Sequence, residues 1–220
     1  MIIMLKAIIF DMDGVLINSV KYCWKAFNIA LKDSGIRLSN EDIKKSMGIP
    51  LKGSLRLWKK DYKIKDYNPE EFSRKAGEIE LELMKKDLHP NKALNNLLKE
   101  AKEKQIKMAL ATSSLRWRVD KILKLLEIKD MFDVILTAED VETHKPSPEI
   151  FLRAAEQMNE NHYDCVVFED ALSGIEAAIR GNMKVVAVKT EFFSEEELKD
   201  ADMVINDFSE ININKLKNMF

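Results

Sequence analysis

Short runs of apolar residues alternate with amphipathic segments along most of the chain. The apolar runs are continuous, which is the pattern of parallel strands that are covered on both faces of their sheet. Runs of this kind predict strands at 6–10, 107–112, 133–137, 164–169, 184–188 and 203–206. The segments between them carry apolar residues at helical spacing. We therefore expect a doubly wound parallel α/β sheet.

Several of the predicted helices have recognisable start signals. Asn91 precedes an apolar face at helical spacing and is expected to cap that helix. Ser147 followed by Pro148 predicts a second helix start. Ser194 with Glu197 matches a capping box and predicts a third.

The alternation of strands and helices is interrupted between residues 20 and 88, where only helical patterns occur. A crossover between two parallel strands does not need so many residues. We expect an α/β core formed by residues 1–16 and 89–220, with an inserted helical domain at 17–88. The insertion would lie at the carboxyl end of the sheet, where open α/β sheets bind their ligands.

The composition predicts a globular protein with a highly charged surface, because 46% of the 220 residues are hydrophobic and 33% are charged. The net charge of −2 comes from interspersed lysines and acids, which gives no indication of a nucleic-acid partner. Cys23 and Cys165 match neither a zinc site nor a disulfide scaffold. No apolar stretch approaches the ~20 residues that span a bilayer. We expect a cytoplasmic protein with no membrane partner, and the pattern specifies no oligomeric partner.

Polar side chains gather at the predicted strand ends. Asp11 and Asp13 close the first strand, although two carboxylates so close together repel each other unless a cation or a proton intervenes. Thr112, Ser113 and Ser114 follow the second strand, Lys145 the third, and Glu169 with Asp170 the fourth. Because parallel strands end at the same edge of a sheet, these groups should meet in one small pocket.

This set of groups fits phosphoryl transfer. Aspartate oxygens suit Mg²⁺ with several waters retained. Hydroxyl and N–H groups at 112–114 would open a helix and form an anion site, and Lys145 could neutralise both an aspartate and a phosphate oxygen. Positioning and charge neutralisation do most of the work in that reaction. Hydride transfer fits poorly, since no Gly-x-Gly-x-x-Gly follows the first strand.

The stretches DMDGV, LATSS, HKPSPEIF and FEDALSGIEAA resemble, in order and spacing, the four motifs of the haloacid dehalogenase superfamily. The similarity is greatest to phosphatases and phosphomutases that carry a helical cap after the first motif, and it covers nearly the whole chain. It implies a Mg²⁺-dependent phosphatase that hydrolyses a small phosphorylated metabolite through an aspartyl-phosphate. Phosphoglycolate, a sugar phosphate, glycerol phosphate and a nucleotide all fit.

The resemblance also implies roles for individual residues. Asp11 would be the nucleophile, and Asp13 would protonate the leaving oxygen and then activate water. Thr112 and the Ser113 amide would hold the phosphate, with Lys145 bridging phosphate and Asp11.

The metal ligands that the resemblance implies are Asp11, the carbonyl of Asp13 and Asp170, while Glu169 binds directly or through water. Glu169 could instead only anchor its loop. Bound Mg²⁺, Lys145 and the proton on Asp13 would make the paired carboxylates tolerable.

The first alternative is a β-phosphoglucomutase. Those mutases resemble this chain but use a cap histidine shortly after the first motif, where this chain has Cys23. The cap arginine that they use is also absent, with Leu51 at the best-matching position and Lys52 beside it. Both departures favour the phosphatase.

A second alternative is a phospho-accepting receiver module, which combines the same residue types and Mg²⁺ on a doubly wound sheet. The helical insertion and the chain length argue against it, because a signalling module needs no lid. Asp13 argues against it too, since a general acid/base would make the phospho-aspartate short-lived.

Lys52 lies in the stretch MGIPLKGSL, between Gly48 and Gly53. These glycines and Pro50 predict a loop. A lysine in a cap loop could contact the leaving group of the substrate, whereas the alternative is a solvated surface lysine.

Overall fold

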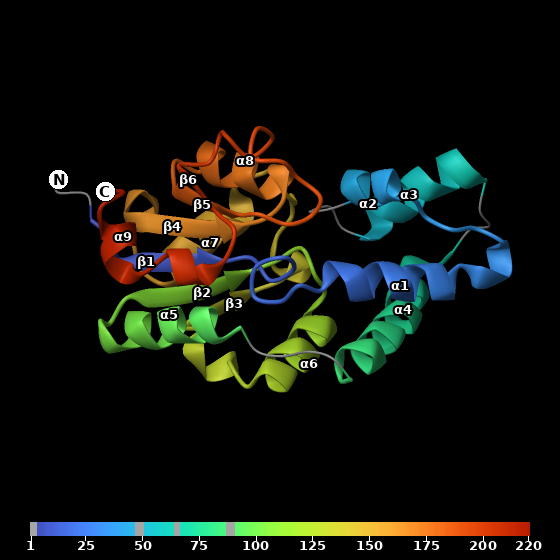
Figure 1. The fold of residues 1–220 in the computed structure, drawn as a ribbon, viewed down its shortest axis with the longest axis horizontal. Helices are drawn as coiled ribbons and strands as arrows, with labels where there is room; N and C mark the ends of the chain where they lie inside the picture. The colour runs from blue at the N-terminus through green and yellow to red at the C-terminus, as the bar shows by residue number, and fades with distance from the viewer. Residues whose placement is uncertain (1–3, 47–50, 64–66, 87–90) are drawn as a thin grey trace. The chain divides into compact units, whose positions relative to one another are not determined.

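The computed structural model describes residues 4–46, 51–63, 67–86 and 91–220. The chain divides into two compact units, of which the first comprises Met1–Ile17 and Pro90–Phe220 and the second Asn18–His89. The first strand therefore belongs to a unit whose other strands all follow the second unit in the sequence (Figure 1).

The first unit is built on a six-stranded sheet of order β3-β2-β1-β4-β5-β6, in which every neighbouring pair is parallel. The strands are β1 (Ala7–Phe10), β2 (Lys107–Ala111), β3 (Val134–Leu136), β4 (Cys165–Glu169), β5 (Lys184–Val188) and β6 (Met203–Ile205). Each lies within one of the apolar runs identified in the sequence. The prediction of a doubly wound parallel sheet is confirmed.

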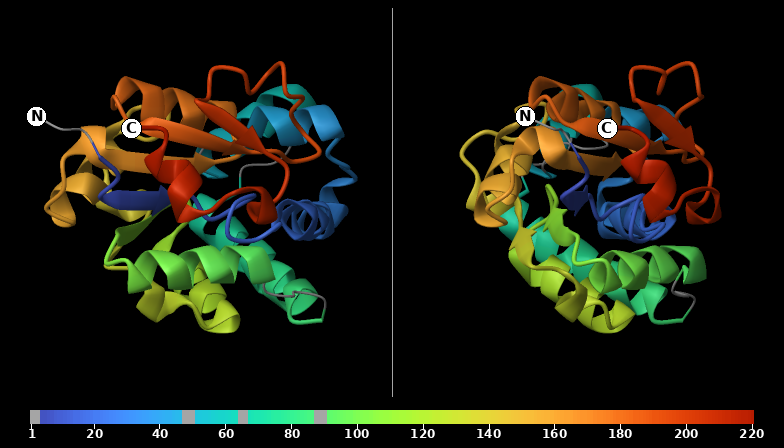
Figure 2. Two further views of the ribbon diagram at one scale, coloured as in Figure 1. Left: turned by 60° about the vertical axis from the view of Figure 1, so that its left-hand side comes forward. Right: turned by 90° about the vertical axis from the view of Figure 1, so that its left-hand side faces the viewer.

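Helices cover both faces of this sheet. Figures 1 and 2 show α5 (Lys92–Glu103) and α6 (Arg116–Leu126) on one face and α7 (Glu149–Gln157) and α8 (Leu172–Arg180) on the other. The short α9 (Ile213–Lys217) packs beside α5. Single 3₁₀ turns complete the unit: η2 (Lys129–Met131), η3 (Ala138–Asp140), η4 (His162–Asp164) and η5 (Phe208–Glu210).

The predicted helix starts have different outcomes. The Asn91 side chain accepts hydrogen bonds from two backbone N–H groups of α5, which confirms the cap. Helix α7 begins at Glu149 with Pro148 as its N-cap, one residue later than Ser147 predicts. Ser194 and Glu197 form their reciprocal hydrogen bonds but no helix follows. Because Leu198 is the one buried side chain in 195–200, a helix there would have no apolar face to bury.

A layer of aromatic rings lies directly beneath the strand ends. Phe10 of β1 and Phe168 of β4 are register partners, and their rings stack with centroids 5.2 Å apart. Phe132 meets Phe10 edge-on at 6.1 Å, and Phe208 contacts Phe168 at 5.3 Å. Close packing of large rings resists displacement of the backbone. The residues that follow Phe10 and Phe168 are thereby held in place.

The second unit is helical in the residues that the structure describes. Its elements are α1 (Val20–Ala30), η1 (Lys32–Ser34), α2 (Asn40–Ser46), α3 (Leu51–Tyr62) and α4 (Pro69–Met84). Its core is a cluster of aromatic rings from α1, α3 and α4 with Tyr67, in which Phe27 contacts Trp24, Trp58 and Phe72. The unit therefore has a hydrophobic core of its own.

The predicted loop around Lys52 is wrong in part. Lys52 and Gly53 lie in the first turn of α3, whereas Gly48 and Pro50 fall outside the described residues. The helix buries Leu55 and Trp58 on one face. That burial outweighs the cost of about 1 kcal/mol for a glycine inside a helix.

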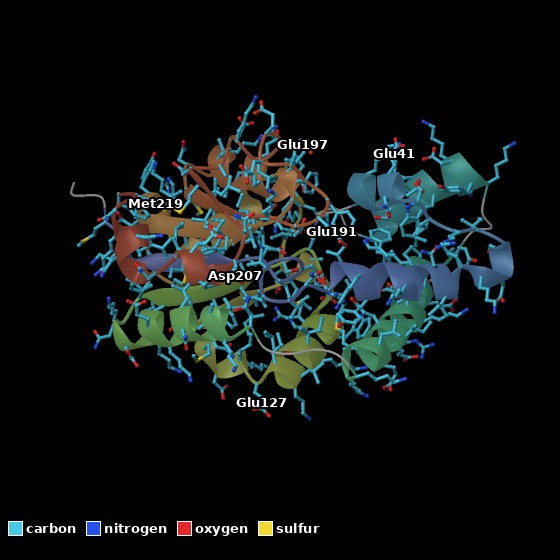
Figure 3. The ribbon with its side chains drawn as sticks, viewed as in Figure 1. Glu41, Glu127, Glu191, Glu197, Asp207 and Met219 are labelled. Atoms are coloured by element: carbon cyan, nitrogen blue, oxygen red, sulfur yellow. The ribbon has the colours of Figure 1, made fainter. Side chains whose placement is uncertain are left out.

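Charged side chains occupy the surface of the first unit, as Glu127, Glu197 and Asp207 illustrate (Figure 3). In the part of the chain that the structure describes, no helix is long and apolar enough to cross a membrane.

Candidate active site

Backbone hydrogen bonds join the carboxyl end of β1 to β4 and that of β2 to β3, one residue beyond the strands. The N–H of Asp11 donates to the carbonyl oxygen of Phe168 at 2.9 Å. The N–H of Thr112 donates to the carbonyl oxygen of Leu136, the last residue of β3, at 3.1 Å. Asp11 and Thr112, the first residues after β1 and β2, are thus held by the same kind of backbone hydrogen bond as the residues within the strands.

Lys145 is buried at this edge of the sheet between two carboxylates. Its Nζ donates to Asp11 Oδ1 and to Glu169 Oε1, each at 2.6 Å, and lies 4.7 Å from the centre of the Phe151 ring. Burial opposes the charged form, but the two carboxylates outweigh it, so the pKa of Lys145 lies above its ordinary value. The loop after β3 therefore delivers a permanent cation to the end of β1.

Asp11 is buried in a strongly anionic environment. Burial raises its pKa to about 7, with the attraction of Lys145 opposing the rise and the nearby carboxylates of Glu169 and Asp13 adding to it. The Asp13 N–H donates to Asp11 Oδ2 at 3.0 Å. Without a further cation, the ionised form of Asp11 is therefore costly at neutral pH.

Asp170 is buried with one oxygen unsatisfied. Its Oδ2 has no hydrogen-bond partner among the residues that the structure describes. Burial, together with the carboxylates of Glu169, Asp11 and Asp13, raises the pKa of Asp170 well above the ordinary value. The carboxylate lies against the backbone of Gly14, where an added Cβ would come within 2.0 Å of Oδ2. Gly14 has a φ of +83°, so glycine is required there for both space and conformation.

Glu169 is engaged at both of its oxygens. Oε1 accepts from Lys145, while Oε2 accepts from the backbone N–H groups of Asp170 and Ala171 at 2.7 and 2.8 Å. A Cβ on Gly174 would come within 1.8 Å of Oε1, so this glycine makes room for the carboxylate. Glu169 thus joins the loop after β4 to Lys145.

The hydroxyl residues after β2 lie in the turn that precedes α6. Helix α6 begins at Arg116 with Leu115 as its N-cap and no side-chain cap, so residues 112–114 do not open the helix as predicted. The buried Thr112 hydroxyl accepts from the Ser114 N–H at 3.2 Å, which closes the turn instead.

Asp13 makes a contact that the sequence reasoning missed. Its carboxylate forms a two-bond ion pair with Arg118 of α6, at 2.7 and 2.8 Å, and accepts from the Ser114 hydroxyl at 2.8 Å. Ser114 lies just before α6 and Arg118 in its first turn, four residues later, so both side chains can reach the same carboxylate. That spacing is the one signal that the sequence offers for the contact.

The side chains that meet are Asp11, Asp170, Glu169 and Lys145, with Asp13 joined to Asp11 through its backbone. Among the described residues, no group of three or more His, Cys, Asp or Glu side chains forms a ready metal cage. The available oxygens are instead the carboxylates of Asp11 and Asp170. Lys52 lies in the second unit and is exposed.

Comparison with known proteins agrees with the motif assignment. The family model described as "Haloacid dehalogenase-like hydrolase" matches residues 8–188, a range that contains all four motifs. The chain is 33% identical over 174 residues to the "Phosphorylated carbohydrates phosphatase" of Thermotoga maritima, a match that covers 79% of this chain and 80% of that protein. The predicted family resemblance is confirmed.

Two further matches cover nearly all of this chain. It is 35% identical over 219 residues to "Protein SUPPRESSOR OF QUENCHING 1, chloroplastic" of Arabidopsis thaliana, which is 96% of this chain but 20% of that protein's length. Among solved structures, β-phosphoglucomutase from Clostridium difficile superposes with a TM-score of 0.84 at 27% identity, covering 98% of this chain and 97% of that one.

The raised pKa of Asp11 predicts a pH dependence of stability in the absence of metal. The folded-state value of about 7 exceeds the ordinary 3.8, so the folded protein binds more protons than the unfolded chain in that interval. The contribution of Asp11 is fully present below about pH 4 and is lost as the pH rises through 7. Between about pH 4 and a pH above 7, the free energy of unfolding of the wild type should therefore fall by up to roughly 4 kcal/mol relative to that of Asp11→Asn.

Urea unfolding in EDTA at a series of pH values in this range measures the difference in the free energy of unfolding between wild type and variant. For Asp200→Asn, at an exposed position of the same unit, this difference should not change with pH. A flat difference for Asp11→Asn as well would mean that Asp11 ionises normally.

Proposed function

The chain belongs to the haloacid dehalogenase-like hydrolases, and on this basis we propose that it is a Mg²⁺-dependent phosphatase of a small phosphorylated carbohydrate. The observation that carries the proposal is the buried Asp11 carboxylate, fixed by Lys145 at the end of β1 with Asp13 two residues away. The relative named "Phosphorylated carbohydrates phosphatase" supports the substrate class. The receiver module loses its support, since the chain matches a hydrolase family.

The reaction proceeds in two steps. A carboxylate oxygen of Asp11 attacks phosphorus, the bond from phosphorus to the leaving oxygen breaks, and Asp13 supplies the proton to that oxygen. Water then attacks the phosphorus of the aspartyl-phosphate and gives a proton to Asp13. The bond between phosphorus and the Asp11 oxygen breaks, so that phosphate leaves and Asp11 is restored. Lys145 keeps the nucleophile oriented and offsets the charge of the incoming phosphate.

The residues present fit a divalent metal. The Asp170 oxygen that lacks a partner is buried beside other carboxylates, which is costly unless a cation binds there. We assign the carboxylates of Asp11 and Asp170 and the carbonyl of Asp13 as ligands, with waters completing the set. Bound Mg²⁺ would reduce the repulsion between nucleophile and phosphate. Each Asp11 oxygen accepts one of the hydrogen bonds of the site, whereas Glu169 Oε2 accepts from two backbone N–H groups and Oε1 accepts from Lys145. We therefore assign Glu169 to holding Lys145 and its loop rather than to direct metal binding.

Thr112 and the Ser113 amide are the proposed phosphate-holding groups, because they lie in the turn between β2 and α6. The helical unit Asn18–His89 is proposed as the cap that selects the substrate. A contact between Lys52 and the leaving group stays a prediction.

A β-phosphoglucomutase is the second candidate, favoured by the superposition on the Clostridium difficile enzyme. Cys23, at the position where the resemblance places a catalytic histidine, lies in α1 with a half-buried thiol. A thiol there does not replace an imidazole as an acid and base near neutral pH. The phosphatase therefore remains the better reading.

Asp11→Asn should abolish turnover while the protein stays folded, because an amide cannot attack phosphorus. Phosphate release across a panel of phosphorylated sugars should fall by a factor of about 10³ or more. Asp13→Asn should also lose most activity but retain phosphate on Asp11, detectable by mass spectrometry after acid quench. Asp200→Asn serves as the control. Substantial turnover by Asp11→Asn would exclude the covalent route.

The proposed metal site predicts opposite effects of Asp170→Asn with and without Mg²⁺. In EDTA the variant should melt at a higher temperature than the wild type, because the neutral amide avoids the cost of ionising a buried, unsatisfied carboxyl group beside other carboxylates. Excess MgCl₂ should raise the melting temperature of the wild type by several degrees, through preferential binding to the folded state, and leave Asp170→Asn unchanged. An equal Mg²⁺ response in both proteins would place the metal elsewhere.

The mutase candidate makes a separate prediction. With β-glucose 1-phosphate and Mg²⁺, the protein should release phosphate or leave the substrate intact. A coupled assay for glucose 6-phosphate detects isomerisation directly. Efficient formation of glucose 6-phosphate would replace the phosphatase assignment with the mutase.

A further inference from the structure

The contact between Arg118 and Asp13 engages the whole carboxylate of Asp13. Arg118 Nη1 donates to Oδ2 at 2.8 Å and Nη2 donates to Oδ1 at 2.7 Å. The Ser114 hydroxyl donates to Oδ2 at 2.8 Å and itself accepts from Arg118 Nη1 at 2.7 Å. The Arg118 side chain is 11% exposed and the Asp13 side chain 32% exposed, so solvent reaches the pair mainly from the side of Asp13.

The same geometry fixes the direction of the Asp13 side chain. The Asp13 main chain is fixed beside the nucleophile, since its N–H donates to Asp11 Oδ2. The side chain turns toward α6, where Arg118 and Ser114 occupy both oxygens. A carboxyl group that serves a leaving oxygen needs one of its own oxygens free and directed at the reacting atoms. In this arrangement Asp13 cannot do so.

We propose that Arg118 is a positioning residue that holds ionised Asp13 in a resting orientation, and that in each turnover this ion pair opens and Asp13 takes up a proton from water before it serves the leaving oxygen. The inference rests on the proposed function, because it assigns Asp13 as the acid/base. The planar guanidinium matches both carboxylate oxygens at once, which a lysine ammonium cannot do. Opening the pair therefore adds to the barrier of the step in which the leaving group departs.

The dependence of rate on the leaving group tests this inference. Alkyl phosphates need the proton from Asp13 because an alkoxide leaves poorly, whereas 4-nitrophenyl phosphate releases a stable phenolate without it. We would measure kcat/KM for 4-nitrophenyl phosphate and for the alkyl phosphate that the wild type hydrolyses fastest. The variants are Arg118→Gln, Arg118→Lys and the control Arg116→Gln. Arg116 is also on α6 and pairs with Asp140 at 2.6 Å, away from Asp13.

In Arg118→Gln the ratio of alkyl to aryl kcat/KM should rise by about three- to tenfold, the factor expected when a charge-assisted hydrogen bond no longer competes. Arg118→Lys should give a smaller rise, and Arg116→Gln none. An unchanged ratio, or an equal loss on both substrates with a lower melting temperature, overturns the inference and makes Arg118 structural. If Arg118→Gln does not fold, the ratio of alkyl to aryl kcat/KM measured for Arg118→Lys distinguishes the same outcomes. If the wild type hydrolyses no phosphomonoester, the proposed function fails and this inference fails with it.

Discussion

The buried ion pairs of Lys145 are the interactions on which the rest of the site depends. One ammonium group satisfies Asp11 and Glu169 at 2.6 Å each, with almost no exposure of the three side chains. Removing one partner from such a group leaves an uncompensated buried charge, which costs about 3–5 kcal/mol. The carboxyl ends of β1 and β4 and the loop after β3 are therefore held in one arrangement, and a nucleophile so held needs little reorganisation to react.

The fold supplies the rigidity that this arrangement requires. Stacked rings of Phe10 and Phe168 support the two strands directly below Asp11 and Glu169. Two glycines, Gly14 and Gly174, leave room for carboxylates that any larger residue would displace. The glycines of the motifs thus serve the acids beside them, and the spacing of the motifs reflects this packing as well as catalysis.

The strands and the groups at their ends could be predicted from the sequence because both depend on local patterns. Continuous apolar runs identify buried parallel strands, and parallel strands bring their ends to one edge. The Arg118 contact could not be found in this way, because it depends on the direction of side chains from two elements. The glycines and the proline around Lys52 predict a loop, whereas in the structure burial of Leu55 and Trp58 places Lys52 in α3. The engaged oxygens of Glu169 became visible only with the backbone N–H groups in place.

The balance of charge in the site relates the proposed metal to the Arg118 contact. The carboxylates of Asp11, Asp13, Glu169 and Asp170 face two cations, Lys145 and Arg118. With all four acids ionised, two negative charges would remain, and the raised pKa values of Asp11 and Asp170 reflect the cost of that state. The unsatisfied oxygen of Asp170 marks where these charges are least compensated. A divalent cation would balance them at that point. When Asp13 turns from α6 toward a leaving group in the proposed cycle, it carries the proton that the leaving oxygen needs. A cation held by Asp11 and Asp170 would lower the repulsion that this movement meets, so the proposed metal site and the Arg118 contact act on the same cluster of charges.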